Sequence, residues 1–158
     1  EAQLFFKTVQ NKIHYGVHGH TAAEVIMQRA DATKNNMGLT AFEGAKVRKK
    51  DVDIAKNYLD EDEMQELNRV VTMYLDFAED QARRHIPMYM KDWETYLNNF
   101  LDMTGREVLS DAGHISAQQA KAHAYEQYEL YDENRKKIEA NEVDLLVEET
   151  EQIKDEIN

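Results

Sequence analysis

The residues best suited to chemistry lie together near the amino end of the chain. Three histidines and two glycines fall within residues 14–20. His14 and His18 are four residues apart, a spacing that places two imidazoles on one helix face, where both can bind one Zn²⁺ ion. His20 is a candidate third ligand, which leaves a fourth position for water. The sequence therefore predicts a site for a divalent metal formed by His14, His18 and His20.

The same turn is also a candidate anion site. Thr21 and Glu24 have the spacing of a capping box, so a helix is expected to begin there. The amino end of a helix attracts anions because its unpaired N–H groups and its dipole face outward. Gly19, His20 and Thr21 are the predicted anion ligands, for example for the phosphate of a nucleotide, with His14 as the catalytic base. In a third interpretation the histidines only cap and pack, since an imidazole readily bonds nearby backbone groups.

Two predicted helices position this turn. The first has apolar residues at intervals of three to four, the period of one buried helix face: Leu4, Phe5, Val9, Ile13 and Val17. Gly16 and Gly19 supply the backbone freedom that a helix end requires. The second helix is expected over residues 21–31, with a polar network of Glu24, Arg29 and Asp31 beneath the turn.

The remaining pattern predicts an all-α fold. Helical spacing continues over residues 51–59, 60–85, 88–103 and from 116 onward, and only one proline interrupts it. Residues 32–50 lack a period and are expected to form a small loop or hairpin. We therefore predict a single helical-bundle-like domain of about six helices.

The composition changes near the carboxyl end. Residues 139–158 contain eight acidic side chains and one lysine. Ile138, Leu145, Leu146, Ile153 and Ile157 suggest an apolar seam on this segment. We expect a helical domain over residues 1–138 and a long acidic helical tail over 139–158, which projects, binds a partner or frays.

Composition also limits the function. The chain has no cysteine, which excludes disulfides and thiolate chemistry. Its net charge of −12 opposes non-specific binding to nucleic acid or anionic lipid, and no apolar run approaches the length of about 18 residues that a membrane span requires, so no membrane partner is expected. Because the chain begins at Glu1 inside a helical pattern, a fragment of a longer protein is expected.

Nine short motifs point to a known family. They lie at 8–14 (TVQNKIH), 19–24 (GHTAAE), 36–40 (NMGLT), 54–59 (IAKNYL), 67–69 (LNR), 73–76 (MYLD), 78–82 (AEDQA), 87–93 (PMYMKDW) and 106–109 (REVL). Together they resemble the RhuM family of bacterial virulence-associated proteins over roughly residues 1–131. The resemblance implies the carboxyl-terminal helical part of such a protein in the bacterial cytoplasm. Nucleic acid would then be contacted only through a missing amino-terminal segment similar to phage-type DNA-binding modules.

A second, degenerate likeness covers residues 14–22. Fic-type enzymes, which transfer nucleotides, carry H-P-F-x-D/E-G-N-G-R at a helix–turn–helix. His14 matches the proton-accepting histidine of that motif and Gly19 its first loop glycine. His18 replaces the magnesium-binding acid and Ala22 the phosphate-binding arginine. His20 and Thr21 stand where asparagine and the second glycine are expected. The likeness implies a similar scaffold more than the same chemistry.

Two functions follow from the sequence. The first is a helical interaction or regulatory domain of a RhuM-like virulence or phage-derived protein, with a protein partner or with self-association. The alternative is a Fic-like nucleotide- or phosphate-binding enzyme, or a histidine metal site at residues 14–20.

Overall fold

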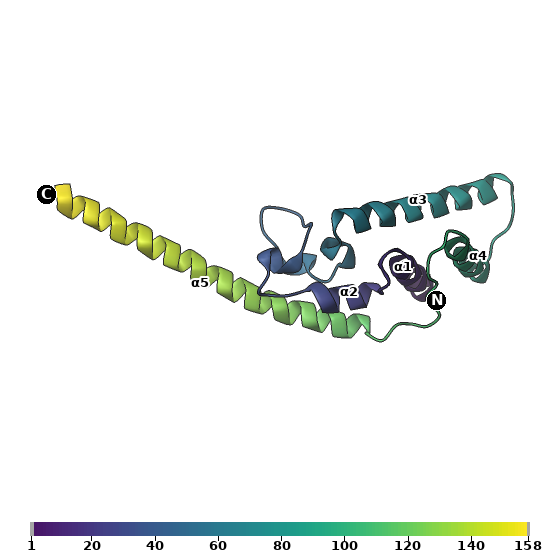
Figure 1. The fold of residues 1–158 in the computed structure, drawn as a ribbon, viewed down its shortest axis with the longest axis horizontal. Helices are drawn as coiled ribbons and strands as arrows, with labels where there is room; N and C mark the ends of the chain where they lie inside the picture. Colours follow the sequence, from purple (N-terminus) through teal and green to yellow (C-terminus); the bar gives the residue numbers. More distant parts are fainter. Residues whose placement is uncertain (1, 158) are drawn as a thin grey trace.

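The computed structural model describes residues 2–157, and helices joined by loops make up that range (Figure 1). The elements are α1 (Ala2–His18), α2 (Ala22–Arg29), η1 (Asn35–Gly38), η2 (Lys49–Asp51), η3 (Ala55–Tyr58), α3 (Glu61–Arg83), α4 (Met90–Met103) and α5 (Ala117–Ile157). The η elements are short 3-10 helices. The prediction of an all-α fold is confirmed: residues 2–157 form five α-helices and three 3-10 helices and contain no strand.

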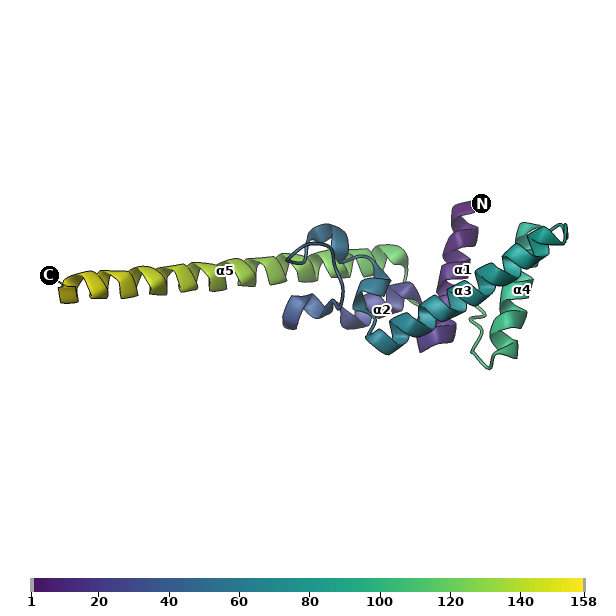
Figure 2. The ribbon, with the colours of Figure 1, turned by 90° about the horizontal axis from the view of Figure 1, so that it is seen from above.

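Helices α1, α3 and α4 surround one of two apolar cores, at the end of the molecule farthest from the carboxyl terminus (Figures 1 and 2). Its buried members are Ile13, Val70, Tyr74, Leu97 and Leu101. The Tyr74 hydroxyl donates a 2.6 Å hydrogen bond to the Trp93 carbonyl, which satisfies the polar end of a largely apolar side chain. Gly16 lies inside α1, where a Cβ atom would stand 3.1 Å from Leu101, so its place is explained by close packing against α4.

The second core lies between α2, the 3-10 helices and the first half of α5. Its buried members are Val25, Ile26, Ala30, Met37, Leu39, Val47, Val52, Ala55, Tyr58, Leu59, Ala120 and Ala124. Leu67 of α3 packs against both cores and so joins them. The two small alanines let α5 approach α2 closely. The body of the molecule, residues 2–135, is therefore held together by two apolar cores that meet at Leu67.

Residues 30–60 form an ordered loop and no hairpin. The Thr40 hydroxyl donates to the carbonyls of Asn57 and Leu59, at 3.0 and 2.5 Å, and pins the two sides of the loop together. The buried Tyr58 hydroxyl donates to the carbonyl of Val52. Residues 51–59, predicted as one helix, instead contain the last residue of η2 and the whole of η3. The bonds from Thr40 and Tyr58 explain the difference, because they hold backbone carbonyls of this segment outside an α-helical pattern.

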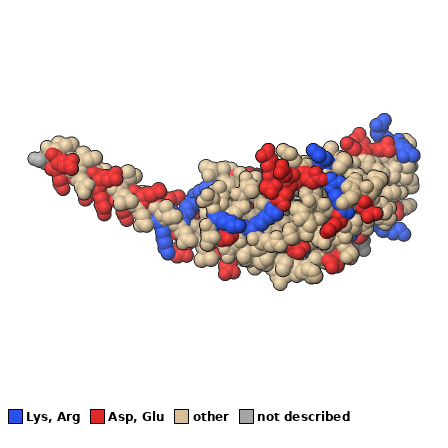
Figure 3. Space-filling view, viewed as in Figure 1, with Lys and Arg blue, Asp and Glu red and all other residues tan. Residues whose placement is uncertain are grey.

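Helix α5 continues without a break through residue 138, where the sequence predicts the end of the helical domain (Figures 1 and 2). Its first half packs on α2, and its second half leaves the body and contacts nothing else in residues 2–157. Every residue from 136 to 157 is exposed, and we call this segment the arm. Acidic side chains follow much of its length (Figure 3). The predicted long acidic carboxyl-terminal helix is confirmed.

Candidate functional site

The histidine turn closes α1 as its sequence suggests. The helix ends at His18, and Gly19 follows with φ of +80°, while its amide donates to the Tyr15 carbonyl at 2.8 Å. His14 is almost fully buried, at 3% exposure. Its Nδ1 atom lies 2.9 Å from Nε2 of His18. The spacing of four residues therefore brings these two imidazoles together in one hydrogen bond.

Burial keeps both imidazoles neutral near pH 7. It lowers the pKa of His14, and it lowers the pKa of His18 to about 4, with a smaller contribution from the neighbouring His14. A neutral imidazole carries one N–H and one acceptor nitrogen, so one ring donates and the other accepts. The Nδ1 atom of His18 is buried and has no hydrogen-bond partner. The pair is thus a desolvated polar contact whose protonation is unfavourable.

His20 lies apart from this pair. Its ring centre is 6.0 Å from that of His18, and the side chain is partly exposed. Within residues 2–157, no three His, Asp or Glu side chains are grouped closely enough to hold a metal ion. The metal site of His14, His18 and His20 stays a prediction, and so does the divalent cofactor that it implies.

The amino end of α2 is closed by the protein itself. The Glu24 carboxylate accepts from the Thr21 amide at 2.9 Å, and the Thr21 hydroxyl accepts from the Glu24 amide at 3.2 Å. Asn11 of α1 accepts from the Ala22 amide at 3.3 Å. Thr21 is 1% exposed, and Gly113 packs directly against it. The capping box is confirmed, but its amides already have acceptors, and the anion site of Gly19, His20 and Thr21 stays a prediction.

Beside the histidines lies an ion pair that the sequence did not indicate. Arg29 of α2 donates two hydrogen bonds to the carboxylate of Glu63 in α3, at 2.6 and 2.8 Å. A third hydrogen bond runs from Arg29 to the Tyr58 carbonyl at 3.0 Å. The Arg29 guanidinium lowers the pKa of Glu63 to about 2. The partners expected for Arg29 lie elsewhere, because Glu24 caps α2 and Asp31 binds Thr33.

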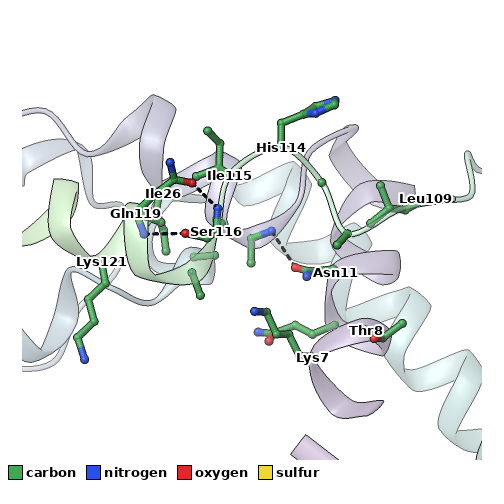
Figure 4. Close-up of a pocket in the computed structure, with 18 of the residues that line it drawn as sticks. Lys7, Thr8, Asn11, Ile26, Leu109, His114, Ile115, Ser116, Gln119 and Lys121 are labelled. Carbon is green, nitrogen blue, oxygen red and sulfur yellow. Dashed lines mark hydrogen bonds between the residues drawn. The ribbon is translucent and has the colours of Figure 1, made fainter. Parts of the chain in front are cut away.

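A pocket of about 660 Å³ opens on another face, between α1, the amino ends of α2 and α5 and residues 109–116 (Figure 4). None of the predicted site residues lines it. Asn11 reaches from α1 toward α2, while His114 points outward. The buried Lys12 ammonium donates to the Leu109 carbonyl at 2.8 Å and therefore holds the rim of the pocket in place.

The arm offers a third candidate surface. Its large apolar side chains are all at least half exposed: Ile138, Val143, Leu145, Leu146, Val147, Ile153 and Ile157. Monomeric soluble proteins rarely leave such a series uncovered, so the arm is a candidate interaction surface. No helix in residues 2–157 has both the length and the apolar composition that crossing a bilayer requires. The apolar residues of this segment indicated the surface from sequence alone. They did not indicate that every residue from 136 to 157 would be exposed.

One comparison with known proteins identifies the chain. The model of the virulence protein RhuM family matches residues 1–139, which cover the body and the first four residues of the arm. No curated protein matches the chain significantly, and no solved structure does. The likeness to Fic-type enzymes stays a prediction. The match spans most of the sequence, and the chain belongs to the virulence protein RhuM family.

Proposed function

We propose that the chain is a protein-interaction domain in which the helical body presents the arm to a protein partner. The observation that carries this proposal is the exposure of every residue from 136 to 157 on one continuous helix. Helices in proteins gain most of their stability from packing an apolar face. The arm has such a face and no packing partner in the body, which supports a role in binding.

The body fixes the direction in which the arm leaves. His123 donates to the Ala30 carbonyl at 3.0 Å, and Gln127 accepts from the Ala32 amide at 2.9 Å. These bonds tie α5 to the chain that follows α2. Farther along, Arg135 bonds both Asp132 and Glu139 at 2.7 Å and so bridges the point where the helix leaves the body. A rigid exit lowers the entropic cost of binding, because less of the arm must be ordered.

The enzyme alternative has less support. A catalytic base must reach the group whose proton it takes. His14 is 3% exposed and already shares a hydrogen bond with His18, and the pocket opens elsewhere. A phosphate at residues 19–21 would compete with the carboxylate of Glu24 for the Thr21 amide. Both observations favour packing and capping roles for these residues.

The interaction role can be tested in the bacterial host with a photoreactive amino acid at Ile153. We expect a discrete crosslinked adduct with a protein, and we expect Leu146→Glu in the same chain to remove it. The matched control is the same photoreactive residue at Leu75, which is similarly exposed but lies on α3. If Ile153 gives no adduct beyond that of Leu75, or if the adduct survives Leu146→Glu, the arm is not the binding surface.

A further inference from the structure

We propose that the partner of the arm is a second copy of the chain, and that two arms pair in parallel and in register. This inference rests on the proposed role of the arm. Five residues of the arm recur at alternating steps of three and four: Val143, Leu146, Thr150, Ile153 and Ile157. That is the spacing of the inner a and d positions of a two-stranded coiled coil. We call these five residues the seam; Ile138 and Leu145, which the sequence pattern groups with Leu146, Ile153 and Ile157, do not fit this spacing and lie outside it.

All five seam residues are exposed in the single chain. Val143, Leu146 and Ile153 are 58%, 62% and 56% exposed, so the stripe is available over its whole length. Thr150 is the one polar member, and a single polar residue at an inner position favours one register over its alternatives at some cost in affinity. The seam therefore has both the apolar area for pairing and a feature that selects a register.

The acidic residues of the arm lie where they interfere least with the pairing of two arms. In the heptad that the seam defines, Asp144, Glu148, Glu151 and Asp155 occupy the b and f positions on the outer side. Pairing along the seam keeps these like charges on opposite sides of the dimer, where salt screens them over about 10 Å at 0.1 M. The arms still repel each other, so the dimer is expected to strengthen as the salt concentration rises.

The flanking charges select the parallel orientation. Glu149 and Lys154 occupy a g position and the following e position, which face each other across the interface of a parallel, in-register pair. In an antiparallel pair the g positions face each other instead, so Glu142, Glu149 and Glu156 would meet like charges. Charge complementarity therefore favours a parallel dimer. Because the seam covers only two heptads, we expect exchange between monomer and dimer that depends on concentration.

Sedimentation equilibrium of the whole chain tests the dimer. We expect the dissociation constant to rise at least tenfold with Leu146→Glu and to change less than twofold with Leu145→Glu. Leu145 is the matched control because it is similarly exposed, at 58%, but lies outside the seam. Far-UV circular dichroism verifies that both variants keep the helical body. A wild-type chain that stays monomeric at every concentration overturns the proposal, and so does equal weakening by the two variants.

Two further measurements test the orientation. Glu149→Lys should weaken the dimer more than Glu148→Lys, an identical charge change on the outer side, and adding Lys154→Glu to Glu149→Lys should restore it. The chain has no native cysteine, so Leu146→Cys should form a disulfide-linked dimer on mild oxidation only if the two 146 positions meet. Failure of either result excludes the parallel pair. If the wild type stays monomeric while the Ile153 adduct with another protein persists, only the dimer fails; if both are absent, the interaction role fails too.

Discussion

Arg29 and Glu63, 34 residues apart in the sequence, meet through two parallel hydrogen bonds of 2.6 and 2.8 Å. The pair joins the last turn of α2 to the first turn of α3, and so connects the two apolar cores. Glu63 also accepts from the Asp60 amide at 3.0 Å, and Arg29 also donates to the Tyr58 carbonyl. One carboxylate thus serves as a helix cap and as the partner of a second helix.

Arg29→Ala should lower the free energy of unfolding by about 2–3 kcal/mol, because Glu63 would keep its partly buried charge without its main donor. Urea unfolding monitored by circular dichroism measures the change. Arg84→Ala is the control, since the Arg84–Asp80 pair is exposed and 3.6 Å long, and its loss should cost less than about 0.5 kcal/mol. Equal costs for the two variants would show that the Arg29 pair contributes no more than a surface contact.

The same pair should make stability depend on pH in the acid range. The pKa of Glu63 is lowered to about 2 in the folded protein, chiefly by the Arg29 hydrogen bonds, from about 4.5 when unfolded. The unfolded chain therefore binds a proton first as the pH falls, so the contribution of Glu63 is complete above pH 4.5 and is lost toward pH 2. Between pH 5 and pH 2, the free energy of unfolding should change less with pH in Glu63→Gln than in the unchanged protein. Identical pH profiles for the two proteins would contradict the assignment.

The local features of this region could be predicted, whereas the pairing of Arg29 with Glu63 could not. A capping box needs only two residues three positions apart, so Thr21 and Glu24 identify the start of α2 from sequence alone. The partner of Arg29 depends on how α2 and α3 pack, and Glu24 and Asp31 are nearer in sequence. Neither carboxylate binds Arg29, because Glu24 caps α2 and Asp31 accepts hydrogen bonds from Thr33.

His18 should give a second pH dependence in a different window. Burial lowers its pKa to about 4, from an ordinary value of 6.5. The folded state therefore binds fewer protons than the unfolded state between pH 6.5 and 4, and stability falls as the pH falls through this window. His18→Gln should flatten the unfolding profile there without changing the slope below pH 4. An NMR titration of the ring should show a midpoint near 4; a midpoint near 6.5 would mean that the ring is solvated.

The course of the loop over residues 30–60 and the continuity of α5 also could not be predicted from the sequence. Residues 51–59 have an apolar spacing suited to a helix, yet Asn57 donates to the Asp51 carbonyl and Tyr58 to that of Val52. These bonds bend the segment into two short turns. In α5 the periodicity revealed a helix, but the composition change at residue 139 resembles a boundary. The helix nevertheless continues through it, and Arg135 and Glu139 bond across the change.

Gly38 should be intolerant of any side chain. Its φ is +87°, and a Cβ atom would stand 2.2 Å from the Arg29 carbonyl oxygen, which belongs to the backbone and cannot turn away. Gly38→Ala should therefore cost roughly 3 kcal/mol or more. Gly44 is the matched control, since its φ is +75° but the nearest atom is the flexible Arg48 side chain at 3.6 Å. Gly44→Ala should cost about 1 kcal/mol. Similar melting temperatures for the two variants would contradict the close approach.

Ligand-induced stabilisation decides between a structural and a catalytic His14. Any ligand that binds only the folded state raises its stability by RT ln(1 + [L]/Kd), about 2.7 kcal/mol at a hundredfold excess over Kd. If His14 only packs against His18, ATP with Mg²⁺, inorganic phosphate and Zn²⁺ should leave the melting temperature unchanged. His14→Ala should then lower it by the same amount with and without them. A rise in the wild type that disappears in His14→Ala would instead establish a ligand site at the turn. His114→Ala is the control, because His114 is exposed and points away from the protein at the pocket rim.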